Sequence, residues 1–194
     1  MEKTKVNLKE IKKSAIKNYY DIVFANEKNE AISITIGEFE ANNIVLCLEK
    51  LPNERPMTYD VFHLILKSFN IKLKEINITK FYDGVYFANA LFEGLKEPID
   101  MRPSDAINIA IREMCPIYLY NNVLEETGFK IETTKTLPLT SEDCLKTVGE
   151  IENLSIFGIN MLKDLLKDAI EREDYQTASL LRDKIKGLNK NKDC

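Results

Sequence analysis

Two stretches of this sequence, 65 residues apart, share a short pattern that constrains the fold more than any other feature. The pattern is acid-Ala-x-x-Ile, and it reads Glu40-Ala41-Asn42-Asn43-Ile44 and then Asp105-Ala106-Ile107-Asn108-Ile109. In both places, three predicted strands give way to an apolar helix. A chain that repeats strand, strand, strand, helix predicts an α+β fold. We expect a mixed sheet with helices packed on it and an internal β-β-β-α duplication.

The spacing of apolar residues defines the elements behind this expectation. Strands are predicted over residues 6–11, 19–25, 31–36, 72–79, 85–92, 97–101 and 117–120. Helices are predicted from residue 38, from residue 58, over 103–114 and over 121–127. The helix from Thr58 is expected to bury Phe62, Ile65, Leu66 and Phe69. Asp83-Gly84 predicts a tight turn between two strands.

The pattern changes after residue 130. Residues 1–130 form the predicted main domain, and residues 131–157 are polar and aperiodic, which predicts a linker. Residues 158–190 predict a C-terminal helical hairpin, with Asp174 capping its second helix. Its apolar positions are Leu162, Leu165, Leu166, Ala169, Ile170, Ala178, Leu181, Ile185 and Leu188. Because two short helices bury little apolar surface alone, they should pack on the main domain, on a second copy or on a partner.

Composition excludes several classes of protein. The net charge is −4, although residues 1–18 hold six lysines against two acids, so the chain is not a general nucleic-acid coat. The four cysteines lie far from one another and from His63, the only histidine, which argues against a zinc site and a disulfide scaffold. No apolar run reaches the roughly 18 residues of a membrane span, and no secretory signal is visible. We therefore predict a cytoplasmic protein without a membrane partner.

Two predicted helix starts carry the residues that phosphate chemistry uses. Arg55 and Arg102 are candidate phosphate ligands, since arginine binds phosphate with two parallel hydrogen bonds. Thr58 and Ser104 stand near them at the same helix starts. The candidate catalytic carboxylates, which could hold a metal or orient water, are Glu40, Asp60 and Asp105.

Each of these residues also has a purely structural interpretation. Pro, Ser, Thr and Asp are common at any helix start, where they cap the helix or complement its dipole. The arginines could form structural ion pairs with Asp100, Asp105 or Glu40. Asp83 fits a turn residue better than a catalytic one, and His63, between Phe62 and Leu64, fits a packed or surface histidine. The residues alone form no established catalytic motif.

Five motifs in order resemble a known family. They are Ile36-Gly37-Glu38-Phe39-Glu40-Ala41, Arg55-Pro56-Met57-Thr58-Tyr59-Asp60, Asp83-Gly84-Val85-Tyr86-Phe87-Ala88, Ile99-Asp100-Met101-Arg102-Pro103-Ser104-Asp105-Ala106 and Pro116-Ile117-Tyr118. Through them, residues 6 to about 129 resemble the bacterial bifunctional nuclease domain. The resemblance implies an α+β fold with an internal repeat, oligomers, and cleavage of both DNA and RNA. The family usually has histidine at the position of Tyr59, so a lost general base is one implication; His63, one helical turn on, is its candidate replacement.

Residues 162–188 resemble the UVR motif of excision-repair proteins and some protease adaptors. The matching residues include Leu165, Ala169-Ile170, Glu173-Asp174-Tyr175, Ala178, Leu181-Arg182-Asp183, Ile185 and Leu188. The resemblance implies a protein-contact module in which one helical hairpin meets another. The predicted contact residues are Leu165, Leu166, Ile170, Leu181 and Ile185. The expected partner is another UVR-type protein or a second copy of this chain.

Two functions from different classes follow from these observations. The first is a nuclease that hydrolyses phosphodiester bonds of DNA or RNA with help from Mg²⁺ or Mn²⁺, although no ligand motif in the sequence identifies a metal site. The alternative is a non-enzymatic regulatory or adaptor protein that acts through the hairpin and an oligomeric main domain. Under either hypothesis we predict a homo-oligomer, most simply a dimer.

Overall fold

The computed structural model describes residues 2–51, 55–131 and 159–190. The strands are β1 (Lys3–Lys13), β2 (Tyr19–Ala25), β3 (Glu30–Gly37), β4 (Leu73–Tyr82), β5 (Val85–Phe92), β6 (Ile99–Met101), β7 (Ile117–Tyr120) and β8 (Phe129–Lys130). The helices are α1 (Glu38–Leu48), α2 (Thr58–Ser68), α3 (Pro103–Glu113), α4 (Asn121–Thr127), α6 (Ile159–Glu171) and α7 (Tyr175–Lys190). Among the described residues, no helix is both long and apolar enough to cross a membrane.

The eight strands form one mixed sheet in the order β6-β5-β4-β7-β1-β2-β3-β8. All neighbouring pairs are antiparallel except β4 and β7, which run parallel. The α+β class and the mixed sheet are therefore confirmed. The predicted Asp83-Gly84 turn joins β4 to β5, and both residues have the positive φ angles, 51° and 77°, that such a turn requires.

The internal repeat is visible in the topology. β1, β2 and β3 form an antiparallel meander that leads into α1, and β4, β5 and β6 form a second one that leads into α3. α1 and α3 both have 11 residues and start 65 positions apart, at Glu38 and Pro103. Asn43 and Asn108, which are equivalent at this spacing, each donate through Nδ2 to a backbone oxygen four residues earlier, at 2.9 Å.

Two element boundaries differ from the prediction for local reasons. β6 begins at Ile99 rather than at residue 97, and Pro98 lies directly before it. Proline has no backbone N–H to donate to a neighbouring strand. α3 ends at Glu113, because Met114 adopts a left-handed conformation with φ 52°.

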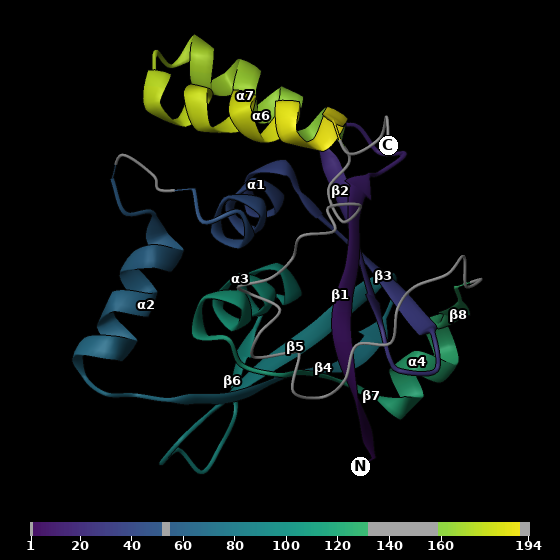
Figure 1. The fold of residues 1–194 in the computed structure, drawn as a ribbon. Helices are drawn as coiled ribbons and strands as arrows, with labels where there is room; N and C mark the ends of the chain where they lie inside the picture. The colour runs from purple at the N-terminus through teal and green to yellow at the C-terminus, as the bar shows by residue number, and fades with distance from the viewer. Residues whose placement is uncertain (1, 52–54, 132–158, 191–194) are drawn as a thin grey trace.

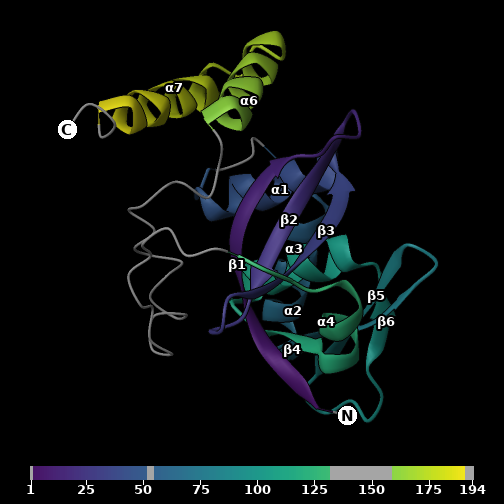
Figure 2. The same cartoon turned by 90° about the vertical axis from the view of Figure 1, so that its right-hand side faces the viewer.

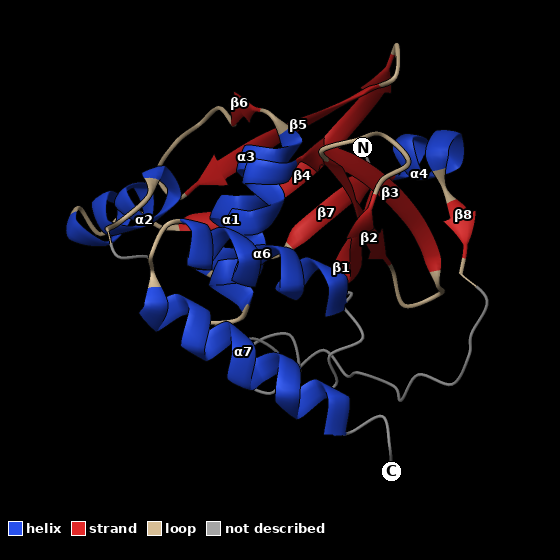
Figure 3. Ribbon diagram, turned by 90° about the horizontal axis from the view of Figure 1, so that it is seen from above, coloured by secondary structure: helices blue, strands red, loops and turns tan. Residues whose placement is uncertain are grey.

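Helices α1, α2 and α3 lie together on one side of the sheet, and α4 lies apart from them, against β3, β4 and β7 (Figures 1 and 3). α1 packs directly on α3. The residues buried between these two helices and the sheet include Ala41, Ile44, Val45, Ala106, Ile107 and Ala110. The packing brings the N-terminal ends of α1 and α3 together, where the predicted site residues Glu40, Arg102 and Asp105 lie.

Helix α2 has a different buried face from the one predicted. Leu66 is buried as expected and Phe62 is partly buried, but Ile65 and Phe69 are 46% and 73% exposed. Tyr59 is buried instead, because it turns toward α3. The apolar spacing correctly predicts that α2 is a helix, but the predicted inward face is wrong.

The predicted hairpin is present as α6 and α7, and it lies across α1 and the β1–β2 end of the sheet (Figures 1 and 2). Its buried residues join the same apolar core as the sheet; they are Leu162, Leu165, Ala169, Ala178, Leu181 and Ile185. Asp174 caps α7 as predicted, since its Oδ1 accepts the Thr177 N–H at 3.0 Å. The predicted linker and the Leu188 side chain lie outside the described residues.

Candidate functional site

The candidate site lies where α1, α2 and α3 meet. On α3, a polar stripe of Asp105, Asn108 and Arg112 runs along one face of an otherwise apolar helix. These residues stand at i, i+3 and i+7, so they share a face. Asn108 anchors the stripe because its Nδ2 donates to the Glu40 backbone oxygen, at 3.2 Å, and so ties α3 to α1.

The outer end of the stripe is an ion-pair cluster around Arg102. The Arg102 guanidinium donates to Asp105 from Nε at 2.7 Å and from Nη2 at 3.0 Å. Nη2 also lies 3.5 Å from Glu40 Oε1. The Arg102 side chain is 67% exposed, against 26% for Asp105 and 18% for Glu40. The two carboxylates therefore contact the Arg102 guanidinium on its protein side, and the rest of the guanidinium faces solvent.

Tyr59 of α2 completes this cluster. Its hydroxyl donates to Asp105 Oδ1 at 2.7 Å. Burial, and then the bond to Asp105, raise the pKa of Tyr59, so the phenol stays protonated near neutral pH. Burial by itself would raise the pKa of Asp105, but the hydrogen bonds from Arg102 and Tyr59 outweigh it and the net shift is downward. Asp105 is thus a carboxylate at neutral pH and a weak proton acceptor.

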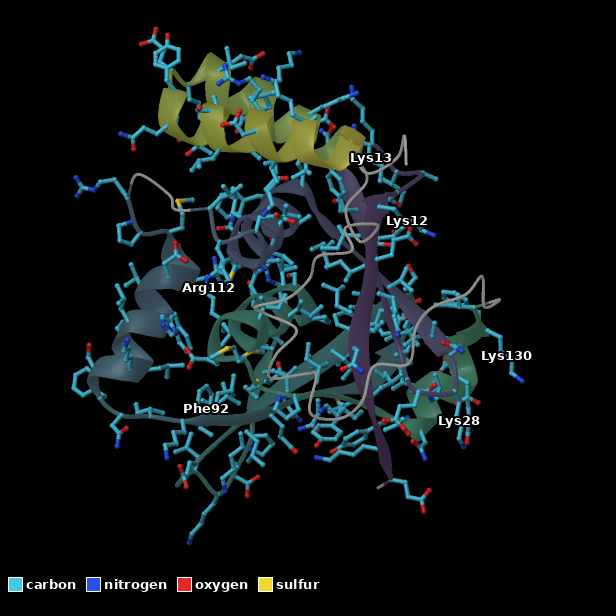
Figure 4. The ribbon with its side chains drawn as sticks, viewed as in Figure 1. Lys12, Lys13, Lys28, Phe92, Arg112 and Lys130 are labelled. Atoms are coloured by element: carbon cyan, nitrogen blue, oxygen red, sulfur yellow. The ribbon has the colours of Figure 1, made fainter. Side chains whose placement is uncertain are left out.

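The inner end of the stripe is a buried ion pair between α2 and α3. Arg112, whose side chain is only 6% exposed, donates from Nε to Asp60 Oδ1 at 2.8 Å. Its Nη1 also donates to the backbone oxygen and to Oδ1 of Asn108, and its guanidinium lies 5.4 Å from the centre of the Tyr59 ring. Figure 4 shows Arg112 between α2 and α1. Asp60 also accepts the Met57 N–H at 2.9 Å and so caps α2.

The structure separates the other predicted residues. Arg55 and Thr58 are exposed, and neither side chain makes a hydrogen bond or ion pair with the part of the chain that the structure describes. Ser104 is buried, on the opposite side of the start of α3. Its hydroxyl has no hydrogen-bond partner among the described residues. The two predicted arginine motifs therefore do not form one site: Arg102 joins the cluster and Arg55 does not.

His63 does not take the place of the family histidine. Its Nδ1 lies 2.7 Å from Glu113 Oε1, near the C-terminal end of α3, whereas Tyr59 reaches Asp105 near the N-terminal end. His63 faces the same helix as Tyr59, but it meets a different carboxylate. The residue at the family's histidine position, Tyr59, is therefore the one that contacts the cluster.

Two hollows lie beside α3, one near its C-terminal end and one near its start. The first, of about 450 Å³, lies between α1, α2 and α3 and includes Cys47, Asp60, His63 and Arg112 in its lining. Burial raises the pKa of the Cys47 thiol. The second, of about 430 Å³, lies between β3, the β4–β5 turn and Ser104.

The carboxylates do not form a metal-ligand set in this arrangement. Glu40 and Asp105 face Arg102, and Asp60 faces Arg112, so each has a cation as its neighbour. Within the described ranges, no three side chains of His, Cys, Asp or Glu gather closely enough to hold a metal ion.

Sequence reasoning missed Arg112, Asn108 and the contact made by Tyr59. A signal for the first two was present, because polar residues at i, i+3 and i+7 interrupt the apolar pattern of 103–113. The Tyr59 contact had no local signal, since it joins residues 46 positions apart.

The predicted interaction residues of the hairpin differ in exposure. Leu165, Leu181 and Ile185 are buried, Leu166 is partly buried, and Ile170 is 53% exposed.

Comparisons with known proteins agree with this architecture. An uncharacterised protein of Mycobacterium tuberculosis is 33% identical over 146 residues, which cover 75% of this chain and 80% of that protein. Bifunctional nuclease 1 of Arabidopsis thaliana is 26% identical over 178 residues, or 84% of this chain and 54% of that protein. Bifunctional nuclease 1 of Oryza sativa subsp. indica is 25% identical over 181 residues, with 86% and 54% covered. The chain thus spans about half the length of these plant relatives.

The family matches cover both parts of the chain. Residues 159–191 match the UvrB/UvrC motif, which includes the α6–α7 hairpin. Residues 22–132 match the bifunctional nuclease domain, and this region is more than half of the chain and contains the whole Arg102 cluster. Both resemblances seen in the sequence are confirmed. The chain therefore belongs to the bifunctional nuclease domain family, with a UvrB/UvrC motif following that domain.

Proposed function

We propose that this chain hydrolyses phosphodiester bonds of DNA or RNA and that Arg102 binds the phosphate. One observation carries the proposal. Asp105 occupies Nε and Nη2 of Arg102, which fixes the plane of the guanidinium, while Nη1 makes no hydrogen bond with any described residue. An exposed guanidinium held in one plane retains the N–H groups that bind a phosphate. Membership of the bifunctional nuclease domain family and the names of the plant relatives also support a nuclease.

The neighbours of Arg102 have distinct roles in this proposal. Asp105 orients the guanidinium, and its lowered pKa makes it a poor base. Tyr59 holds Asp105 from the other side and keeps its proton. Glu40, whose Oε1 lies 3.5 Å from Nη2, is the candidate for orienting the attacking water. We propose Mg²⁺ or Mn²⁺ as the assisting metal.

A cleavage assay tests the proposal directly. Purified wild-type protein and the variants Arg102→Ala and Asp105→Ala are incubated with labelled DNA and RNA, with Mg²⁺, with Mn²⁺ and with EDTA. We expect each variant to lose at least about 100-fold in rate, as removal of one charge-stabilising donor does in other enzymes. Arg172→Ala, which removes an exposed arginine paired with Asp168 at 3.0 Å, is the matched control. Equal cleavage by all four proteins would assign the activity to a contaminant.

A second candidate function is favoured by the closed ion pairs. Asp60 is engaged by Arg112, and Glu40 and Asp105 are engaged by Arg102, so the cluster is a satisfied structural network as it stands. This supports an adaptor that acts through the UvrB/UvrC hairpin on another UVR-type protein or on a second copy. If wild-type protein cuts neither DNA nor RNA in the assay above, the adaptor replaces the nuclease. In either case the cytoplasm remains our proposed compartment, and the free thiols of Cys47 and Cys115 fit it.

A further inference from the structure

We propose that the β4–β5 ribbon and the hollow beneath it bind single-stranded nucleic acid, with one unstacked base entering the hollow beside Ser104. The inference rests on the proposed function in taking nucleic acid as the ligand. It adds where the bases bind and which form of nucleic acid is preferred. The site is separate from the ion-pair cluster around Arg102, although both flank the start of α3.

The hollow offers apolar walls with polar groups at the edges. Its walls include Ile34 and Ile36 of β3 and the ring pair Phe81 and Tyr86, whose centres lie 4.7 Å apart. The Ser104 side chain supplies a hydroxyl in a residue that is only 9% exposed, and that hydroxyl has no hydrogen-bond partner in the described parts of the chain. A flat heterocycle with apolar faces and polar edges matches such a lining.

Backbone groups at the same place add hydrogen-bonding capacity. β8 pairs only with Glu30 and Ala31, so beyond them β3 has no described strand on that side. Ser33 and Thr35, in this unpaired part, also line the hollow. At the start of α3, Pro103 has no N–H, and the Arg102 side chain makes no capping bond. Unpaired strand edges and helix starts are the backbone groups that remain able to bind a ligand.

The outer face of the ribbon provides a place for the neighbouring bases. Tyr82 is 63% exposed and Phe87 is 39% exposed, and the Lys80 ammonium lies 4.5 Å and 5.6 Å from their ring centres. The ladder is irregular between Ile78 and Lys80, where a bulge turns the ribbon. Figure 3 shows the ribbon extending to a projecting turn on the side where β3 lies. Exposed aromatic residues with a lysine between them stack bases and contact phosphate.

Charge selects nucleic acid as the occupant. The Lys80 ammonium lies beside the exposed rings of Tyr82 and Phe87, so a cation stands next to the aromatic surface where a phosphate would pass. A duplex keeps its bases paired and stacked, so moving one base into the hollow costs more free energy in a duplex than in a single strand. The ribbon should therefore prefer a single strand to a duplex of the same length.

Fluorescence anisotropy in EDTA tests the site without relying on cleavage. The probe is a labelled oligothymidylate of about 12 nucleotides, within known single-strand site sizes; a hairpin duplex and an abasic strand of the same length are compared with it. We expect Tyr82→Ala and Phe87→Ala each to weaken binding at least about fivefold, and Ser104→Ala to weaken it about threefold. Lys80→Gln should lower the salt slope by about 0.7. Tyr175→Ala, at a 69% exposed tyrosine of the hairpin, is the control.

Three results would overturn the inference: equal affinity for the abasic strand, equal affinity for the duplex, or no difference between the ribbon variants and Tyr175→Ala. Because anisotropy measures binding and needs no catalysis, this test of the ribbon site is independent of the test of the proposed function. Loss of cleavage in Arg102→Ala with unchanged binding in the ribbon variants removes the ribbon site and keeps the nuclease. Weakened binding in the ribbon variants without any wild-type cleavage removes the nuclease and keeps the ribbon site.

Discussion

At the scale of single residues, the two repeats differ at equivalent positions of α1 and α3. Cys47 stands in α1 at the position that Arg112 has in α3, 65 residues on. Arg112 donates to Asn108 Oδ1, whereas Asn43 Oδ1 is buried and unpartnered among the described residues. The arginine of the second repeat therefore accounts for both the satisfied amide and the ion pair with Asp60. The first repeat lacks both, and Cys47 and Arg112 line the same hollow.

The two arginines of the cluster should differ sharply in their effect on stability. Arg112→Met removes the cation that pairs with Asp60, whose side chain is 30% exposed, and we expect the free energy of unfolding to fall by about 2 kcal/mol. Arg102→Met removes an ion pair at a 67% exposed side chain and should cost less than about 1 kcal/mol. Urea denaturation of both variants measures the difference. Similar losses for both would mean that the Arg112 pair contributes no more than a surface one.

At the scale of elements, α2 leaves an apolar face uncovered. Val61, Leu64, Ile65 and Phe69 lie on one side of the helix and are 43%, 49%, 46% and 73% exposed. The sequence indicated that α2 is amphipathic, but its buried side was misjudged because apolar residues occupy both sides of the helix. A cluster of exposed apolar residues commonly marks an interface between proteins.

We expect self-association through α2 rather than through the hairpin. Ile65→Asp combined with Phe69→Asp should shift the protein from a dimer or larger oligomer to a monomer, because charges enter an apolar contact. Sedimentation velocity at micromolar concentration measures the shift. Ile170→Asp, at a 53% exposed position of the hairpin, is the matched control and should leave association intact. Dissociation caused by Ile170→Asp alone would instead show that the hairpin forms the interface.

At the scale of the whole molecule, the hairpin is docked on the domain that precedes it. Leu162 and Leu181 are fully buried in the common core. Lys13 pairs with Asp164 at 2.5 Å, at the end of β1 where Figure 4 labels it, and Lys184 pairs with Glu49. The Glu49 side chain is only 4% exposed, so the second pair joins α7 to the end of α1 in a largely dry contact.

Removing the buried contact should release the hairpin before it unfolds the domain. Lys184→Met leaves the Glu49 carboxylate buried without its cation, which costs about 3 kcal/mol, and undocking the hairpin relieves this cost. Hydrogen exchange should then rise in α6 and α7 and stay unchanged in β2 and β3. Lys186→Met, two residues further along α7 at an exposed position with no ion pair to a described residue, is the control. Faster exchange throughout the chain would show that hairpin and domain unfold together.

Local patterns were enough to predict much of this protein. Apolar spacing and the positions of Gly and Pro act between near neighbours in sequence, so the helices, the strands other than β8, the Asp83-Gly84 turn and the Asp174 cap were predicted from the sequence. The five motifs likewise predicted the family. Only the tertiary structure decided which face of α2 is buried, that Tyr59 meets Asp105, that Arg112 neutralises Asp60, and that Arg55 stays apart from Arg102. These contacts join residues about 50 positions apart, and they depend on how α1, α2 and α3 pack, which no local pattern encodes.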